Sequence, residues 1–527
     1  MLLKYSDKQE AYQLRRNEKK GKAVLMRHTV REYLDILFSN GLVKSFILSS
    51  ELMEKEICDL TFSTKNQQAG GIFICKGAAF KKEYLEKAVE NGALLYVSES
   101  AYSVRIPAII VNDVRSAMPL LADLFFDGAL NSMISVGVTG TKGKTTTSFM
   151  VKSALDCYLS QNEDTKCALL SSVKIFDGKD EEPSLMTTPE AVEYQRIFAR
   201  ARDNGCKYIV SEVSSQGLKY QRCIPARYKV AVFTNITPDH ISPNEHTDFE
   251  DYFESKLKIF DMCENALVFS GCDRFERVCD AARKSGVNLY TFGYRENDDF
   301  FVSDVKALDS SSVISVMGDE YTVPMPGSFN VTNALAAISV CKILEIPEQY
   351  IKEGLKDVRV DGRCEIFESR DKEICAVVDY AHNKESVNAL IGLAKEYYPD
   401  KKICLLFGCP GGKAYNRREE IGTIAAGCDY VIVTEDDPAG EELSAICDEI
   451  VGYVKKGRAD CRVISDREEA IGFALDNYRK HTVILIAGKG SERTQKRKNG
   501  PEEYLSDSYY VRKRLSRYEE EILSVKD

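Results

Sequence analysis

The chain has 527 residues, of which 44% are hydrophobic and 29% are charged, a balance typical of globular proteins. Since single cores stop growing at about 250–300 residues, this length predicts about three domains. The 71 basic and 81 acidic residues give a net charge of −10, which argues against a nucleic-acid partner. No apolar run approaches the ~20 residues of a membrane span, so we expect no membrane insertion.

The cysteines indicate a reducing compartment. There are 17 of them, scattered and without a CxxC pair, which argues against a disulfide framework or a zinc ribbon. Residues 1–25 are charged and lack the apolar core of a signal peptide. We expect a cytoplasmic monomer. Residues 1–26 are predicted to be a disordered extension, or translation starts at Met26, and the sequence leaves both alternatives open.

A first domain of mixed α/β type is predicted over residues 27–130. Its elements are separated by glycine and polar turns. Helices are expected at Val30–Leu37 and Arg115–Phe126, and strands at Gly70–Gly77, Ala93–Val97 and Ile106–Val111.

A central domain is predicted over residues 131–357. It opens with a buried-strand pattern at Ile134–Val138, followed by a glycine-rich turn and an amphipathic helix at Thr145–Tyr158. Two more apolar strands, Tyr208–Val213 and Tyr228–Phe233, end in polar residues. This alternation predicts a doubly wound parallel sheet.

A C-terminal, Rossmann-like domain is predicted over residues 358–527. Four short apolar strands each run into a polar or glycine-rich loop, at Ala376–Asp379, Ile403–Phe407, Tyr430–Val433 and Val483–Ala487. Ligands of open α/β sheets bind beyond the carboxyl ends of the strands, so we expect both large domains to face a shared cleft. The predicted fold class is therefore α/β with three domains.

A phosphate-binding loop is predicted at Thr139–Thr146, TGTKGKTT, between the first central strand and its helix. Gly140 and Gly143 let backbone N–H groups face an anion, and the helix N-terminus adds its positive dipole end. Lys144 would reach the outer phosphates, and the Thr145 hydroxyl would bind Mg²⁺. The alternative is a structural glycine turn with a solvated lysine.

This loop, with Val138 at the first glycine of the standard pattern, resembles that of the Mur ligases and folylpolyglutamate synthases. Further segments resemble, in the same order, motifs of the UDP-N-acetylmuramoyl-tripeptide synthetases of that family. They are LMTTPE (Leu185–Glu190), EVSSQ (Glu212–Gln216), NITPDH (Asn235–His240), YFESK (Tyr252–Lys256), GSFNVTN (Gly327–Asn333), DGR (Asp361–Arg363), DYAHN (Asp379–Asn383) and GKG (Gly488–Gly490).

The resemblance covers nearly the whole chain from about residue 27 onward. Three segments, Lys76–Leu85, Thr237–His246 and Phe249–Phe253, are most similar to lysine-adding enzymes. The resemblance implies an ATP-dependent amide ligase of peptidoglycan precursor synthesis, with Mg²⁺ as the cofactor. Such an enzyme phosphorylates the terminal carboxylate of UDP-MurNAc-L-Ala-D-Glu, and the amine of a diamino acid attacks the acyl phosphate. The first domain would bind the UDP-muramoyl part, the central domain ATP, and the C-terminal domain the amino acid, closing the site by rotation.

Catalytic roles follow from the resemblance for Lys144, His240 and Lys256. The metal site would consist of Thr145, Glu212, His240 and a carbamoylated Lys256. Mg²⁺ would repel an ammonium, whereas a carbamate is an anion that can bind it. Judged alone, Lys256 would be a surface lysine and His240 a structural histidine. The implied ATP-binding residues are Gly140, Thr141, Lys142, Gly143, Lys144, Thr145, Thr146, Asn330, Asn333, Arg363, Asp379 and His382.

Two of these residues, Asn330 and Asn333, are three positions apart, so a helix places them on one face, where their amides could read adenine. The alternative is that Asn330 caps the helix N-terminus. Arg363 and Asp379 would close over the nucleotide, and His382 would lie near its ribose or phosphates.

On the muramoyl side, the planar fork of Arg222 suits a carboxylate or a diphosphate. The sequence departs from the family in two places: Tyr220 stands where a glutamine is usual, and Ser63–Lys65 stands where Asp-Ser-Arg is usual. Thr64 can still replace the serine hydroxyl at the uracil. The implied contacts of the UDP-muramoyl substrate are Thr64, Thr187, Thr188, Ser214 and Arg222.

The added amino acid is predicted from the C-terminal domain. Diaminopimelate-adding members carry DNPR, whose arginine pairs with the distal carboxylate, whereas this chain has DDPA at Asp436–Ala439. A further arginine of those enzymes is Lys413 here. These changes favour L-lysine, because an unpaired buried carboxylate would cost several kcal/mol. Ornithine and meso-diaminopimelate stay open. The implied contacts are Lys413, Asp436, Asp437, Gly488 and Glu492.

Three other functions would each predict a different sequence. A different amide ligase, such as a folylpolyglutamate synthase or a cyanophycin-synthetase-like enzyme, would not need a uridine-binding domain at residues 27–130. A non-catalytic paralogue that binds nucleotide or wall precursor would be expected to have lost Lys144, Glu212 or Lys256, and all three are present. A generic P-loop NTPase does not account for the ordered later motifs.

Overall fold

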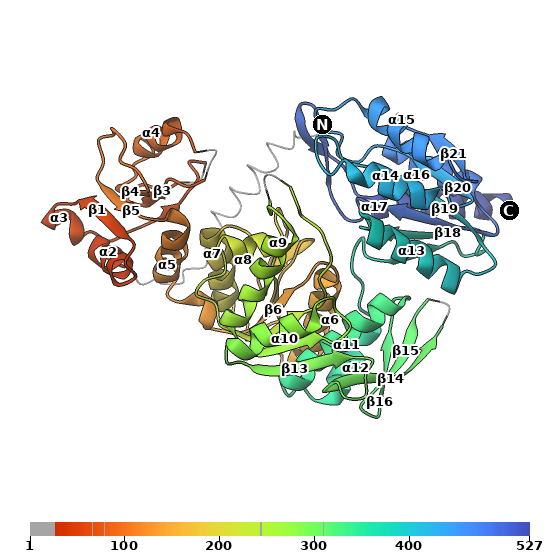
Figure 1. Cartoon of the computed structure of the whole chain (residues 1–527), viewed down its shortest axis with the longest axis horizontal. Coiled ribbons are helices and arrows are strands. Elements are labelled where there is room, and N and C mark those ends of the chain that lie inside the picture. Colours follow the sequence, from red (N-terminus) through yellow and green to blue (C-terminus); the bar gives the residue numbers. More distant parts are fainter. Residues whose placement is uncertain (1–26, 66, 78–79, 243–244, 309, 527) are drawn as a thin grey trace. The chain divides into compact units, whose positions relative to one another are not determined.

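The structure is a computed structural model that describes residues 27–526, except residues 66, 78–79, 243–244 and 309. The predicted extension at residues 1–26 lies outside the described residues. The chain divides into two compact units (Figure 1). The first unit contains residues 27–302 together with Asn333–Gly354, and the second contains Ser303–Thr332 together with residues 355–526.

The N-terminal part of the first unit is a sheet in the order β1-β5-β4-β3-β2. Its strands are parallel except for β1, which runs antiparallel to β5. A capping box between Thr29 and Glu32 starts the first helix. The elements are α2 (Val30–Ser39), β1 (Val43–Ile47), α3 (Ser50–Met53), β2 (Leu60–Thr61), β3 (Ile72–Ile74), α4 (Lys82–Glu90), β4 (Leu95–Ser98), β5 (Ala108–Val111) and α5 (Val114–Phe125).

Within the first unit, a larger sheet has the order β13-β12-β11-β6-β10-β7-β8-β9, and the next strand, β14, crosses the chain boundary between the units. Strand β6 lies between β10 and β11 and is parallel to both. The strand order reverses at β6, which makes its carboxyl end the switch point where ligands enter a doubly wound sheet. The strands are β6 (Ile134–Thr139), β7 (Ala168–Leu170), β8 (Lys174–Phe176), β9 (Glu181–Pro183), β10 (Tyr208–Glu212), β11 (Tyr228–Phe233), β12 (Cys263–Phe269), β13 (Asn288–Gly293) and β14 (Phe300–Ala307).

Helices connect these strands and cover the sheet. Helix α6 follows β6 directly, so its N-terminus faces the switch point. The helices are η1 (Ala129–Asn131), α6 (Lys144–Ser160), α7 (Ala191–Asp203), α8 (Ser215–Lys219), α9 (Phe249–Leu257), η2 (Lys258–Met262), α10 (Phe275–Lys284) and α12 (Glu348–Lys356). Helix α11 (Ser328–Ile343) contributes residues to both units.

The second unit is built on a sheet in the order β17-β18-β22-β19-β20-β21. Strand β17 is antiparallel to β18, and the other pairs are parallel. Helices α13–α15 and helices α16–α17 pack on opposite faces, each over its own apolar core (Figure 1). The strands are β15 (Ser312–Val316), β16 (Asp319–Val323), β17 (Glu365–Glu368), β18 (Cys375–Asp379), β19 (Lys402–Phe407), β20 (Tyr430–Val433), β21 (Asp460–Val463), β22 (Thr482–Ala487), β23 (Thr494–Arg497) and β24 (Gly500–Glu503), and the helices are α13 (Lys384–Tyr397), α14 (Asn416–Ala425), α15 (Leu443–Val454), α16 (Arg467–Asn477) and α17 (Asp507–Lys526).

The predicted α/β class is confirmed, and β11 and β20 begin and end at the predicted residues. Strand β3 is shorter than predicted: Gly70 and Gly77 have φ of +80° and +91°, outside the extended region, so they flank the strand and do not extend it. Among the described residues, no helix is long and apolar enough to cross a membrane.

Candidate functional site

The phosphate loop lies between β6 and α6, as predicted. Gly140 and Gly143 have φ of +146° and +84°, a region that favours glycine. A Cβ on Gly140 would collide with Thr234 Oγ1, just beyond β11. The Lys142 N–H donates to Asn235 Oδ1 at 2.8 Å. The segment after β11 therefore fixes the shape of the loop.

The two loop lysines make contacts near their own backbone. Lys144 Nζ donates to the carbonyls of Gly140 at 2.9 Å and Thr141 at 3.0 Å. Lys142 Nζ lies 3.3 Å from Asp239 Oδ2. Thr146 is buried at the start of α6. To reach a phosphate, Lys144 would give up its hydrogen bonds to two neutral carbonyls and donate to a charged phosphate oxygen. A hydrogen bond between two charged groups is stronger than one to a neutral carbonyl.

Thr145 and Glu212 meet at Ser172. The Ser172 N–H donates to Glu212 Oε1 at 2.9 Å, and the Ser172 and Thr145 hydroxyls are 3.0 Å apart. Oxygen ligands of this kind suit Mg²⁺, which usually rests on one or two protein oxygens plus phosphates and water. No group of three or more His, Cys, Asp or Glu side chains that could hold a metal occurs in the described part of the chain. The residues present therefore fit an ion shared with a nucleotide.

Lys256 is buried against the phosphate loop, with 1% of its surface exposed. Its Nζ donates to the Gly140 carbonyl at 2.8 Å, the same oxygen that Lys144 contacts. Burial lowers the pKa of Lys256 well below its usual value, and the charge of Lys144 lowers it further. The interpretation as a surface lysine is therefore wrong. A neutral buried amine is a nucleophile, which carbamoylation requires.

His240 follows the segment that carries Asp239. It has φ of +57°, and its Nδ1 lies 3.0 Å from Glu245 Oε1. Its side chain is half-exposed, and no contact among the described residues joins it to Glu212 or Lys256. The structure therefore does not bring the two predicted metal residues His240 and Glu212 together.

His246, in the same loop, was not predicted as a site residue. It is fully buried, with Nε2 3.0 Å from Ser215 Oγ and its backbone N–H donating to the His240 carbonyl at 3.2 Å. It thus joins the His240 loop to the start of α8. In the sequence, His246 stands at the end of the segment Thr237–His246. That position alone does not distinguish a histidine that anchors a loop from one that binds a ligand.

The predicted adenine-reading asparagines both lie within α11, so Asn330 is not an N-cap. Asn330 Nδ2 donates to the Pro326 carbonyl at 2.8 Å. Asn333 Oδ1 lies so close to Gly143 that a Cβ there would collide with it. Asn333 therefore lies against the phosphate loop.

Three predicted nucleotide residues lie together near the end of β18. Asp379 Oδ2 accepts the Cys364 N–H at 2.7 Å, which ties the DGR turn to the strand. The Arg363 guanidinium lies 4.3 Å from the centre of the Tyr380 ring, and His382 Nδ1 lies 2.7 Å from the Tyr380 carbonyl. These contacts order Arg363 and His382 on either side of Tyr380.

The predicted muramoyl contacts fall into one group and two separate residues. Thr188 Oγ1 donates to the Glu212 carbonyl at 3.0 Å and accepts the Ser214 N–H at 2.9 Å. Arg222 donates to the Thr188 carbonyl at 3.1 Å. Thr188, Ser214 and Arg222 therefore lie together beside Glu212. Thr187 and Thr64 are partly exposed, and within the described residues no contact joins them to this group.

The predicted amino-acid contacts converge around Lys489, a fully buried residue that was not predicted as a site residue. Its Nζ lies 2.7 Å from Asp437 Oδ1 and 2.7 Å from Glu492 Oε2. Burial alone would lower the pKa of Lys489, but Asp436, Glu492 and Asp437 outweigh it and raise the pKa. Asp437 and Glu492 are therefore already paired with a cation.

Asp436 differs from its neighbours. It is 9% exposed, packs against Gly488, and makes no ion pair within the described residues. Burial raises the pKa of Asp436 to about 6, although Lys489 and Arg467 pull it down. Lys413 is exposed and is not part of this cluster.

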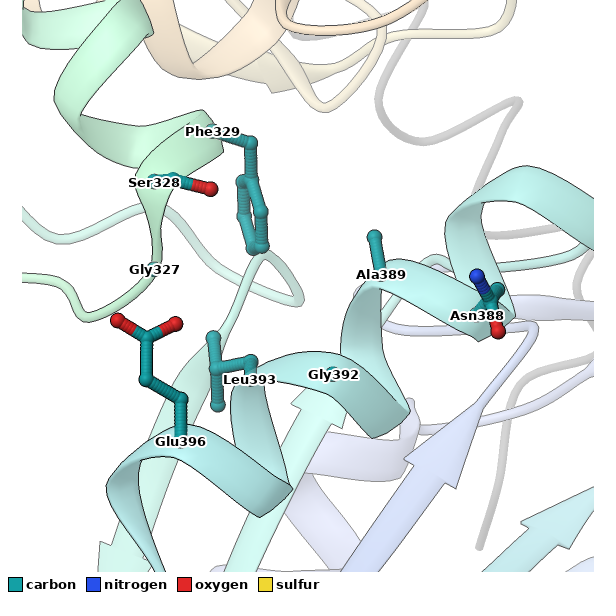
Figure 2. A pocket seen from close by; sticks show the side chains of 8 residues that line it. All are labelled: Gly327, Ser328, Phe329, Asn388, Ala389, Gly392, Leu393 and Glu396. Atoms are coloured by element: carbon teal, nitrogen blue, oxygen red, sulfur yellow. The ribbon is translucent and has the colours of Figure 1, made fainter. Parts of the chain in front are cut away.

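A pocket of about 300 Å³ lies in the second unit, between the start of α11 and helix α13. Figure 2 shows the Phe329 ring between these helices and the Glu396 carboxylate directed toward Gly327. None of the predicted ATP-binding residues lines this pocket, and its other lining residues are Ser328, Asn388, Ala389, Gly392 and Leu393.

Known protein families match both large parts of the chain. Residues 138–341 match the Mur ligase middle domain, and residues 362–490 match the Mur ligase glutamate ligase domain. The chain is 34% identical to the UDP-N-acetylmuramoyl-L-alanyl-D-glutamate–L-lysine ligase of Enterococcus faecalis, over 90% of this chain and 96% of that protein. It is 36% identical to the UDP-N-acetylmuramyl-tripeptide synthetase of Bifidobacterium longum, over 84% of this chain and 88% of that protein.

Solved structures show the same fold. A UDP-N-acetylmuramoyl-L-alanyl-D-glutamate–2,6-diaminopimelate ligase has a TM-score of 0.62 and 22% identity, covering 94% of this chain and 99% of that one. A MurF ligase of Thermotoga maritima in complex with ADP has a TM-score of 0.58 and 19% identity, covering 88% and 98%. With these relatives and with both matched domains in place, the chain belongs to the Mur ligase family of ATP-dependent ligases.

Proposed function

We propose that the chain joins L-lysine to the glutamate carboxylate of UDP-MurNAc-L-Ala-D-Glu, using ATP, in the synthesis of a peptidoglycan precursor. One observation carries the chemistry: the buried amine of Lys256 lies on the carbonyl of Gly140, inside the phosphate loop. A lysine with a strongly lowered pKa at that point has no evident structural use, but it is what a carbamate beside a nucleotide needs. The names of the relatives support the choice of substrates.

The reaction would run in two steps. A carboxylate oxygen of the substrate attacks the γ-phosphorus of ATP, so that ADP leaves and an acyl phosphate forms. The lysine amine then attacks the acyl carbon, the amide bond forms, and phosphate leaves. Lys144 and the N-terminus of α6 would stabilise the phosphate charge in the first step. Lys142, held beside Asp239, is within the same loop and would add a second positive charge.

The metal requirement belongs to the same proposal. Thr145 and Glu212 would hold a Mg²⁺ ion together with phosphate oxygens, since both side chains contact Ser172. When bound, the ion neutralises charge on the transferring phosphoryl group. A carbamate on Lys256 would supply a further anion beside it. The Thr188 hydroxyl contacts the backbone of both Glu212 and Ser214 and fixes their relative positions. This arrangement would place the substrate next to that ion.

The preference for lysine rests on charge. Three carboxylates, Asp436, Asp437 and Glu492, surround the ammonium of Lys489, and Lys496 Nζ lies 3.8 Å from Asp437 Oδ2. Arg467 is also near, but Asp507 neutralises it through two hydrogen bonds of 2.7 and 2.8 Å. The acidic excess favours a side chain that ends in ammonium over one that ends in carboxylate. Because Asp437 is already paired, we assign the ammonium contact to Asp436.

The test offers L-lysine, L-ornithine and meso-diaminopimelate in parallel to the purified protein with ATP, Mg²⁺ and UDP-MurNAc-L-Ala-D-Glu. Phosphate release and product mass are read together. We expect a product heavier by one lysine residue and slow reaction with the other two amines. Turnover with diaminopimelate alone would leave the ligase intact but refute the charge argument. No phosphate release with any amine, from folded protein that binds ATP, would refute the proposed function and favour a non-catalytic paralogue.

A further inference from the structure

One side chain of the second unit contacts both the predicted nucleotide residues and the predicted amino-acid residues. Tyr380 directly follows β18, and its hydroxyl donates to Glu492 Oε1 at 2.8 Å. The Arg363 guanidinium lies 4.3 Å from the centre of the same ring, and the His382 ring lies 4.7 Å from it, edge to face. The hydroxyl and the ring of Tyr380 therefore contact different neighbours.

The loops that carry these neighbours touch each other through their backbones. The Gly488 N–H donates to the Asp379 carbonyl at 3.1 Å. Gly362 packs on the other end of the same loop, because a Cβ at Gly362 would lie 2.2 Å from the backbone nitrogen of Ser491. Such a close approach requires glycine. The DGR turn therefore lies directly against the loop that carries Glu492.

Both oxygens of the Glu492 carboxylate have a partner. Oε1 accepts from Tyr380, and Oε2 lies 2.7 Å from Lys489 Nζ. The Glu492 side chain is 39% exposed, and a glutamate that is free in solvent exchanges among several rotamers. With both oxygens held, Glu492 keeps one orientation. A carboxylate has about four lone-pair sites, so it can still accept a hydrogen bond from an ammonium group.

The Tyr380 hydroxyl stays protonated at neutral pH and acts as a donor. Burial raises the pKa of the phenol, and the negative charge of Glu492 raises it further, whereas the charge of Arg363 lowers it. A neutral donor leaves the negative charge of a carboxylate in place, whereas the ion pair with Lys489 offsets it. Tyr380 therefore fixes the position of Glu492 without neutralising it.

We propose that Tyr380 is a positioning residue for the amine of the added amino acid: its hydroxyl orients Glu492, and its ring holds Arg363 on the nucleotide side. This inference rests on the proposed function, because it takes an amine to bind at Glu492 and a nucleotide to bind at Arg363. Cations are attracted to the face of an aromatic ring, so the ring restricts the position of Arg363. A single side chain then links recognition of the amine to that of the nucleotide.

The first test separates the hydroxyl from the ring. Tyr380→Phe removes the hydrogen bond to Glu492 and retains the ring. The KM for L-lysine is expected to rise about 10-fold, because a hydrogen bond to a charged group is lost, while the KM for ATP should stay as in the wild type. Tyr380→Leu removes the ring as well and should raise both KM values. Steady-state phosphate release with saturating UDP-MurNAc-L-Ala-D-Glu gives both values.

Tyr518→Phe is the matched control. Tyr518 lies on α17 and donates to Asp371 Oδ2 at 2.9 Å, so this variant also loses a hydrogen bond between a tyrosine and a carboxylate. Its KM values should equal those of the wild type. A general loss of folded protein would lower kcat and leave KM unchanged, so it does not mimic the result expected for Tyr380→Phe.

A double-mutant cycle tests whether Tyr380 acts through Glu492. Glu492→Gln removes the charge that would attract the amine and is expected to raise the KM for L-lysine by itself. In a protein that already carries Glu492→Gln, the further change Tyr380→Phe should have little effect, because the carboxylate that the hydroxyl orients is gone. Residues of one hydrogen-bond network show such non-additive effects, whereas the effects of independent sites add.

The outcomes separate this inference from the proposed function. If Tyr380→Phe leaves the KM for L-lysine unchanged, or if the two changes of the cycle are additive, Tyr380 does not position Glu492, while the ligase proposal stands. If Tyr380→Phe raises the KM for ATP as much as that for L-lysine, the assignment of the hydroxyl to the amine is wrong. If the wild-type protein releases no phosphate with any amine, the proposed function fails, and this inference fails with it.

Discussion

At the scale of single residues, the structure explains why two buried side chains have shifted pKa values. Lys256 and Lys144 both donate to the Gly140 carbonyl, which two ammonium groups would do only against their mutual repulsion. The lowered pKa of Lys256 removes that conflict, because the neutral amine still has N–H groups to donate. Asp436 is the converse case, a buried acid whose pKa is raised to about 6.

We predict that Lys256→Ala lowers the rate of ligation by about 100-fold or more. The variant cannot form the carbamate whose negative charge would lie beside the transferring phosphoryl group. Propionate at high concentration should restore part of the rate by supplying a carboxylate in the vacated space. The control is Lys258→Ala, which changes an exposed lysine two positions away. Full activity of Lys256→Ala would contradict the assigned role.

Asp436→Asn is predicted to stabilise the protein while lowering lysine incorporation. A folded-state pKa raised from 3.8 to about 6 means that Asp436 contributes its full stability below pH 4 and loses it as the pH rises through 6. A shift of this size corresponds to about 3 kcal/mol. Thermal unfolding of both proteins should therefore coincide near pH 4, diverge between pH 4 and pH 6, and stay apart above pH 6. A variant that is less stable at pH 7.5 would show that the carboxylate has a partner.

At the scale of elements, the phosphate loop depends on contacts from segments far away in the sequence. The segment after β11 holds Lys142, and Asn333 of α11 lies against Gly143. Helix α11 thus fills the space that a side chain at Gly143 would need. The loop and this helix act together as one structural element of the site.

Gly143→Ala is predicted to weaken ATP binding by about 10-fold or more. The backbone there has φ of +84°, and the new Cβ would collide with Asn333 Oδ1. The measurement is ATP affinity in the absence of the other substrates. Gly286→Ala is a suitable control, since Gly286 also has positive φ but nothing within 4 Å of its Cβ position. Equal losses in both variants would point to backbone strain and away from the Asn333 contact.

Much of the fold could be predicted from local patterns. Apolar runs such as those of β11 and β20 gave correct bounds, because buried parallel strands read as continuous hydrophobic segments. The phosphate loop was predictable for the same local reason, since its glycines stand directly between strand and helix. The placement of Asn330 inside α11 was open, because helix starts are poorly fixed by sequence.

The contacts that pair charges were not predictable. Lys76 meets Glu190, and Lys489 meets both Asp437 and Glu492, only because the sheets bring distant loops together. Asp437 was predicted to contact the substrate amine, but whether it was already paired depends on the position of Lys489. Sequence spacing carries no information on such long-range pairs without the fold.

At the scale of the whole molecule, each unit contains a local cluster of side chains in which one sign of charge prevails. In the first unit, Lys76 and Arg222 outnumber the Glu190 carboxylate that pairs with both. In the second unit, Asp436, Asp437 and Glu492 outnumber Lys489 and Lys496. A substrate with an anionic diphosphate and a partner with an ammonium group would each find the opposite charge. This division agrees with a ligase that joins one anionic and one cationic substrate.

The most direct test of this account follows oxygen atoms through the reaction. UDP-MurNAc-L-Ala-D-Glu labelled with ¹⁸O in the glutamate side-chain carboxylate is incubated with the protein, ATP, Mg²⁺ and L-lysine, and all products are analysed by mass spectrometry. An acyl phosphate predicts a product heavier by one lysine residue and one ¹⁸O atom transferred to each phosphate released. Phosphate without ¹⁸O, or no lysine-containing product, would contradict the account.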